Sequence, residues 1–322
     1  MKELSLYKTL LIACLTLSSQ IQAQENITVP ELYGHIEYLT QKKLKGRTPG
    51  GRLNKKVIRY LRTDLKKSGV KHFNHGYFQP FYVQMRSEKE ESPGPTVQTW
   101  NIMGYIPGHD TDSKNEYIVL GAHYDHLGMG GPSSKAPTKS GLHAGADDNA
   151  SGTAALLEIA EKLSANRELL DRSIIIVAFG AEEQGLKGSS YFIDHPPVPK
   201  EQIKLMINMD MVGRLNDQKH IYMGGAGTFP NGMELMKKTG NAQGLSPIVH
   251  AGEVGGSDHV SFYRQKISVL GLHTGAHPQY HTPEDTIELI NFAGTQKVAE
   301  YIYQVILKLA SKDQELRFID QG

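Results

Sequence analysis

The chain has 322 residues, of which 39% are hydrophobic and 21% charged, so it is long enough to bury a large core. Its 35 Lys and Arg residues balance 34 Asp and Glu residues, and a net charge near +1 argues against non-specific nucleic-acid binding, which needs a concentrated basic face. The single cysteine, Cys14, excludes a disulfide within the chain and a zinc site built from thiolates.

The first 23 residues are typical of a secretion signal. An apolar run over residues 9–17 follows a short lysine-bearing start, and Ala23 offers a small residue before the cleavage point. The apolar run is too short to span a bilayer as a mature helix. The residues before Cys14 resemble a bacterial lipoprotein cleavage box, so a lipid anchor at Cys14 is the alternative. Either route predicts a periplasmic or secreted protein with one domain over residues 24–322.

Helix and strand patterns alternate through the chain. In order, we expect helices over 30–43 and 54–68, strands over 78–84, 96–105 and 117–122, a helix ending near 163, strands over 174–179, 204–211 and 220–223, a helix near 231–239, a strand over 268–273 and a helix over 292–309. Residues 174–179 form a continuous apolar run, which is typical of a central parallel strand covered by helices on both faces. The pattern predicts an α/β fold with three layers, α/β/α, around a mixed, mostly parallel central sheet.

Several of the expected buried strands end in acids or histidines. Ligands of open α/β sheets bind just beyond the carboxyl ends of the strands. The side chains expected there are His123, Glu182, Glu183 and Asp210, with His281 and the Asp147–Asp148 turn close by. Imidazole and carboxylate without thiolate is the ligand set of catalytic zinc. Three carboxylates and two histidines suit two ions bridged by one carboxylate, with a further acid left as the base that deprotonates a water molecule.

The spacing of these residues indicates which of them act together. His123 and Asp125 lie two apart, so in an extended segment the Asp125 carboxylate could accept a hydrogen bond from the second ring nitrogen of His123. Glu182 and Glu183 are adjacent, so one can bind metal while the other faces the cleft. His281 directly precedes the letters TPED, which have the pattern of a capping box at the start of a helix.

Five motifs together resemble the M28 family of co-catalytic zinc aminopeptidases. They are HxD at His123 and Asp125, GADDNASG at 145–152, AEExGLxGS at 181–189, NMDM at 208–211 and YHTPEDT at 280–286. Their order and approximate spacing also match, and the resemblance covers almost all of residues 30–310. The GRTPG loop at 46–50 resembles the amino-terminal region of the family.

The resemblance implies a fold of the zinc-dependent exopeptidase type and a role for each residue of the motifs. His123 and Asp210 would hold one Zn²⁺, Glu183 and His281 the other, and Asp148 would bridge the two. Glu182 would be the general base, Asp125 would orient His123, and Tyr280 would stabilise the oxyanion. A cis peptide bond is implied after Asp148. The implied function is a secreted di-zinc metallopeptidase acting on peptide or aminoacyl substrates, with aminopeptidase favoured over carboxypeptidase by family weight alone.

Several alternatives stay open beside this hypothesis. A glutaminyl cyclase resembles M28 in fold but uses one zinc, and a non-catalytic binding module could use the same fold. A serine hydrolase is disfavoured because no GxSxG occurs. Asp147 is expected to stabilise a turn or to contact a residue that binds metal, rather than to bind metal itself. A surface or hydrogen-bonded role is favoured over a ligand role for His126, His143, His273 and His277.

Overall fold

The computed structural model describes residues 26–87, 93–136, 138, 140–253 and 255–321. The predicted secretion signal, including Cys14, lies outside these residues. Among the described helices, none combines the length and the apolar character needed to cross a membrane.

The structure contains the helices and strands expected over residues 30–309, together with three elements that were not predicted, at Lys187–Asp194, Ser246–Val249 and His259–Tyr263. The helices are α2 (Val29–Thr40), α3 (Gly51–Lys67), α4 (Gly152–Ala165), α5 (Lys187–Asp194), α6 (Gly232–Ala242), α7 (His259–Tyr263) and α8 (Phe292–Ala310). The strands are β1 (Phe78–Gln84), β2 (Thr96–Ile106), β3 (Tyr117–His123), β4 (Ser173–Phe179), β5 (Ile203–Met209), β6 (His220–Gly224), β7 (Ser246–Val249) and β8 (Ser268–His273).

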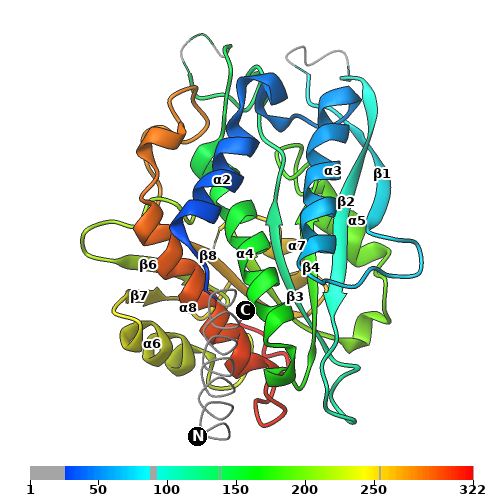
Figure 1. The fold of residues 1–322 in the computed structure, drawn as a ribbon, viewed down its shortest axis with the longest axis vertical. Helices are drawn as coiled ribbons and strands as arrows, with labels where there is room; N and C mark the ends of the chain where they lie inside the picture. The colour runs from blue at the N-terminus through cyan, green and yellow to red at the C-terminus, as the bar shows by residue number, and fades with distance from the viewer. Residues whose placement is uncertain (1–25, 88–92, 137, 139, 254, 322) are drawn as a thin grey trace, which may run out of the picture.

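The strands form one sheet of eight in the order β1-β2-β4-β3-β5-β8-β6-β7. The central strands β4, β3, β5 and β8 are parallel to their neighbours within this block. Antiparallel pairs flank the block, with β2 against β4 on one side and β6 against β8 on the other. Figure 1 shows β1 and β2 at one edge of the sheet and β6 and β7 at the other. The prediction of a mixed, mostly parallel sheet is confirmed.

The apolar run of β4 explains its central position. Ile174, Ile176 and Ala178 join the larger hydrophobic core on one face of the sheet. Ile175 and Val177 join a second core on the opposite face. Successive strand side chains point to opposite faces, so a strand buried on both sides must be apolar at every position.

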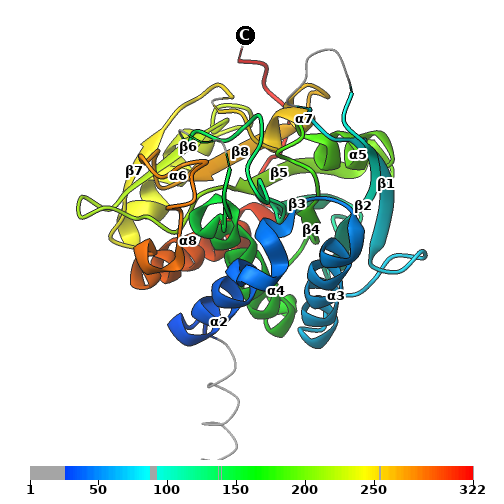
Figure 2. The same cartoon turned by 90° about the horizontal axis from the view of Figure 1, so that it is seen from above.

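Helices cover both faces and make the three predicted layers. Figure 2 shows α2, α3, α4 and α8 on one side of the sheet, and α5 and α7 on the other. The first group packs into the larger core, and the second contributes Phe192 and Phe262 to the smaller one. Because β3, β4, β5 and β8 run parallel, their carboxyl ends meet at one edge of the sheet, where the predicted site residues follow.

Candidate metal centre

The parallel strands bring the predicted side chains to one place. His123 is the last residue of β3, and Asp210 directly follows β5. Glu183 follows β4 after a short turn, and His281 lies in the loop after β8. Asp148 comes from a helical turn, Ala146–Ser151, that precedes α4. The predicted cis peptide bond is present between Asp148 and Asn149.

A first cluster of polar atoms forms around His123. Its Nε2 atom lies 3.3 Å from Asp148 Oδ1 and 3.4 Å from Asp210 Oδ1. His123 and Asp148 are 1% and 2% exposed. Among the described residues, His123 Nε2 and Asp210 Oδ1 have no hydrogen-bond partner. These buried atoms therefore converge on a common point without bonding one another.

A second cluster shares Asp148 with the first. His281 Nε2 lies 3.1 Å from Asp148 Oδ2 and 3.3 Å from Glu183 Oε2. Glu183 is 5% exposed. The two oxygens of Asp148 thus face different clusters, as a carboxylate bridging two cations would.

The spacing and chemistry of these atoms fit bound metal. Two atoms ligating a tetrahedral zinc at about 2.0–2.1 Å lie about 3.4 Å apart, and the distances of 3.1–3.4 Å within each of the two clusters agree with that value. Buried carboxylates gathered without a compensating cation would be costly. The structure therefore brings the five predicted ligands together in an arrangement that can hold divalent cations.

Asp125 takes a different position from the one predicted. The Nδ1 atom of His123 lies 3.1 Å from the main-chain carbonyl of Asp125 and 3.8 Å from its carboxylate, so the carbonyl fixes the ring. The Asp125 carboxylate instead accepts from the main-chain N–H groups of Glu182 and Glu183, at 3.0 and 3.4 Å. The predicted hydrogen bond from the ring to the Asp125 carboxylate is wrong: β3 ends at His123, so Asp125 lies beyond the strand in which the two side chains would share a face.

The predicted capped helix after His281 is also wrong. Residues 282–285 form a turn, and the next helical segment is the short 3-10 turn Ile287–Leu289. Asp285, which the sequence suggests for the first helical turn, accepts instead from the main-chain N–H groups of Asp147 and Asp148, at 3.0–3.1 Å. The His281 side chain is held by a contact outside this segment: its ring Nδ1 atom lies 3.0 Å from the carbonyl oxygen of Ser133.

Charge and burial shift the pKa values of the two adjacent glutamates, Glu182 and Glu183, in opposite directions. Burial raises the pKa of Glu182 well above its ordinary value, and the neighbouring Glu183 adds to the shift. Burial and Asp148 also act to raise the pKa of Glu183, but hydrogen bonds from His126 and His281 outweigh them and lower it to about 2. Glu183 is therefore an anion ready to bind a cation, whereas Glu182 has the raised pKa that suits a proton carrier.

The other histidines of this region make hydrogen bonds, as the sequence favours. His143 contacts Ser134 Oγ at 2.8 Å, and His277 contacts Asp147 Oδ2 at 3.2 Å. The Asp147 carboxylate also accepts from the main-chain N–H of Gly213 at 2.6 Å, so it makes hydrogen bonds within the loops around the site, as expected of a residue that does not bind metal.

Arg47 is a residue near the site whose part the sequence did not reveal. Its side chain is fully buried, and its guanidinium donates four hydrogen bonds of 2.6–3.0 Å to the carbonyls of Leu39, Tyr124, Ala144 and Gly145. These carbonyls belong to the end of α2 and to the segments that carry the ligands from β3 and from the turn before α4. The only signal in the sequence is the GRTPG loop itself, because contacts to main-chain atoms leave no complementary residue to find.

The loop that carries Arg47 depends on a glycine. Gly46 has φ +63°, and a Cβ atom there would lie 2.2 Å from the His143 carbonyl oxygen. Gly46→Ala is therefore expected to lower the free energy of unfolding by at least about 2 kcal/mol in urea titrations. Gly34→Ala, in the helix α2, is the matched control, because no atom lies within 4 Å of the position that a Cβ at residue 34 would take. Equal urea midpoints for the two variants would contradict this account of the loop.

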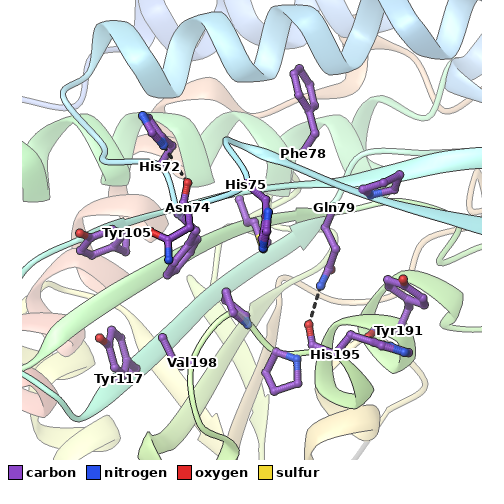
Figure 3. A pocket seen from close by; sticks show the side chains of 15 residues that line it. His72, Asn74, His75, Phe78, Gln79, Tyr105, Tyr117, Tyr191, His195 and Val198 are labelled. Atoms are coloured by element: carbon purple, nitrogen blue, oxygen red, sulfur yellow. Dashed lines mark hydrogen bonds between the residues drawn. The ribbon is translucent and has the colours of Figure 1, made fainter.

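A cleft of about 250 Å³ opens beside the two ligand clusters. Glu182 and Tyr280 line it together with glycine-rich segments around Gly255 and Gly271. A cavity of about 530 Å³ lies elsewhere, near Tyr117, the first residue of β3, and therefore away from the carboxyl end of that strand (Figure 3). Its lining contains histidine, tyrosine and proline side chains but no carboxylate, and among the described residues its histidines belong to neither group of side chains spaced to hold a metal ion.

Comparison with known proteins identifies the family to which this architecture belongs. Residues 101–306, which are 206 of the 322, match the family model for Peptidase family M28. The chain is a member of the M28 peptidase family, and the predicted family is confirmed.

The similar curated proteins are named as aminopeptidases. Aminopeptidase YwaD of Bacillus subtilis is 30% identical over 214 residues, which cover 63% of this chain and 43% of that protein. Leucine aminopeptidase 2 of Trichophyton equinum is 30% identical over 187 residues, which cover 55% of this chain and 34% of that protein. The matched region thus spans less than half of the length of either relative.

Solved structures share the fold at low sequence identity. BSAP, a zinc aminopeptidase from Bacillus subtilis, superposes with a TM-score of 0.71 and 18% identity, over 91% of this chain and 98% of its own. A glutaminyl cyclase of Bacteroides thetaiotaomicron bound to N-acetylhistamine gives 0.69 and 21%, over 88% of this chain and 98% of its own. These similarities confirm the predicted α/β fold.

Proposed function

We propose that this protein is a zinc aminopeptidase with two Zn²⁺ ions per chain. The observation that carries the proposal is Asp148, whose two oxygens face two separate clusters of ligands. Family membership and the aminopeptidases among its relatives support the activity. The secretion signal expected over residues 1–23 would deliver the enzyme to the periplasm or outside the cell.

The five ligands divide between the two ions. His123 and Asp210 would hold one, Glu183 and His281 the other, and Asp148 both. Zinc bound there supplies a Lewis acid for the scissile carbonyl and lowers the pKa of a water molecule.

Glu182 and Tyr280 are the side chains that would act on the substrate. Both line the cleft without belonging to either ligand cluster. The Glu182 carboxylate would take the proton of the attacking water and pass it to the nitrogen of the leaving amine. Burial raises the pKa of the Tyr280 hydroxyl, with the anions Asp148 and Glu183 adding to the shift, so it stays protonated and can donate to the oxyanion.

Tyr280→Phe removes only the hydroxyl that would make this donation. We expect kcat to fall by about 10²–10³-fold with KM little changed, because the bond forms in the transition state. Tyr191→Phe, on the wall of the distant cavity, should leave kcat unchanged. Steady-state kinetics of the two variants measure the difference, and an unchanged kcat in Tyr280→Phe would remove the tyrosine from the mechanism.

Glutaminyl cyclase activity is the second candidate, because a glutaminyl cyclase is among the structures that share the fold. A single-zinc enzyme would leave one of the two clusters without a cation, although the atoms of both are spaced as ligands. The presence of both clusters favours the two-metal hydrolase.

A substrate screen separates the candidate activities. Aminoacyl and acyl-blocked chromogenic substrates, with and without a chelator, are expected to show chelator-sensitive release from the free-amine compounds alone. Glutaminyl substrates should be hydrolysed without forming pyroglutamate. Release from blocked substrates alone, pyroglutamate formation, or activity indifferent to the chelator would contradict the proposed function.

A further inference from the structure

His126 lies beside the second ligand cluster but makes a different kind of contact from the five proposed ligands. Its side chain is fully buried just after β3. Its Nδ1 atom lies 2.8 Å from Glu183 Oε1 and 3.8 Å from Asp148 Oδ2. With Asp148 and Glu183 it forms a group of polar atoms that all lie within 4.8 Å of one another. Two roles fit such a position: a ligand of the second cation, or a hydrogen-bond donor to Glu183.

The distances separate these roles. Atoms that ligate one tetrahedral zinc lie about 3.4 Å apart, and His281 Nε2 meets this spacing with Asp148 and Glu183, at 3.1 and 3.3 Å. The 2.8 Å between His126 Nδ1 and Glu183 Oε1 is shorter than any of the ligand pairs and is a hydrogen bond. The 3.8 Å to Asp148 is longer than any of them.

We infer that His126 is a positioning residue that acts on the metal centre through Glu183. Its Nδ1–H donates to Glu183 Oε1, which leaves Oε2 directed at the position beside His281. A carboxylate free to rotate can offer either oxygen to a cation, so fixing one oxygen holds the other in the ligating place. The inference rests on the two-metal centre proposed above, and it adds a residue to the control of the second ion.

The surroundings of His126 hold its ring in this orientation. A Cβ atom at Gly145 would lie 2.5 Å from ring carbons of His126, so only a glycine lets the main chain pack this closely against the imidazole. Glu183 is fixed from its other end too, because its main-chain N–H donates to the Asp125 carboxylate. The chain therefore holds both partners of the hydrogen bond from outside the ligand set.

Two substitutions of His126 distinguish donor from ligand. His126→Leu keeps much of the volume but removes the donor, and His126→Asn places an amide N–H close to the position of Nδ1. Metal-free protein is titrated with Zn²⁺ against a competing chelator, which gives one dissociation constant for each of the two cation positions. The same titration of Asp210→Ala, which lacks a ligand of the first position only, shows which constant belongs to the second position. His126→Leu is expected to weaken the second position about 10–100-fold and leave the first within about threefold. His126→Asn should keep both constants near those of the wild type, with an unchanged Co²⁺ absorption spectrum.

Each contrary result has its own meaning. Equal weakening of the second position by His126→Asn and His126→Leu would make His126 a ligand and overturn the inference. So would an unchanged second constant in His126→Leu, or an equal loss at both positions, which would indicate a general structural role. A wild-type protein that binds one ion or none would overturn the proposed function and this inference with it.

Discussion

Glu182→Gln is expected to lower kcat by about 10²–10⁴-fold while leaving the zinc content of the protein unchanged. The amide keeps the shape of the side chain but cannot accept the proton of the attacking water. Glu182 belongs to neither ligand cluster, so its loss should not release metal. Steady-state kinetics and elemental analysis of the same preparation measure the two quantities together.

The adjacent glutamate provides a matched control. Glu183→Gln makes the same chemical change one residue away, at a carboxylate 3.3 Å from His281 Nε2. It should lose the second ion as well as activity. Full activity in Glu182→Gln, or loss of zinc from that variant, would show that the two glutamates have been assigned the wrong roles.

Asp148→Ala is expected to lose both zinc ions under conditions in which the wild type retains two. One side chain contacts both clusters, at 3.3 Å from His123 and 3.1 Å from His281, so its removal takes a ligand from each ion. The loss should abolish activity. Elemental analysis after dialysis measures the metal, and far-UV circular dichroism establishes that the variant is folded.

Asp210→Ala makes the comparison specific. Asp210 contacts only the first cluster, and its side chain is 22% exposed. This variant should keep one ion per chain. If folded Asp148→Ala retained two ions, Asp148 could not be the bridge between them.

Much of the fold, and the place at which the candidate site residues gather, could be predicted because both follow from patterns along the strands. The apolar run of β4 indicated a strand covered on both faces, and such strands in parallel share one carboxyl edge. Acids and histidines placed just after several such strands had to come together. Topology therefore predicted that these side chains would meet, whereas the resemblance to the M28 family supplied their division into five ligands and a base.

The contacts around the ligands could not be predicted in the same way. The partner of Asp125 depended on where β3 ends, because a two-residue spacing places side chains together only while the backbone stays extended. Arg47 binds main-chain carbonyls, which every residue possesses. The partner of His126 lies 57 residues further along the chain, at a glutamate that the sequence had already assigned to metal.

Anomalous diffraction at the zinc edge, from crystals of the full chain grown with zinc, tests the central claim most directly. The account predicts two peaks about 3.5–4 Å apart, one between His123 and Asp210 and one between Glu183 and His281, with Asp148 contacting both. A single peak, or peaks away from these five side chains, would contradict it.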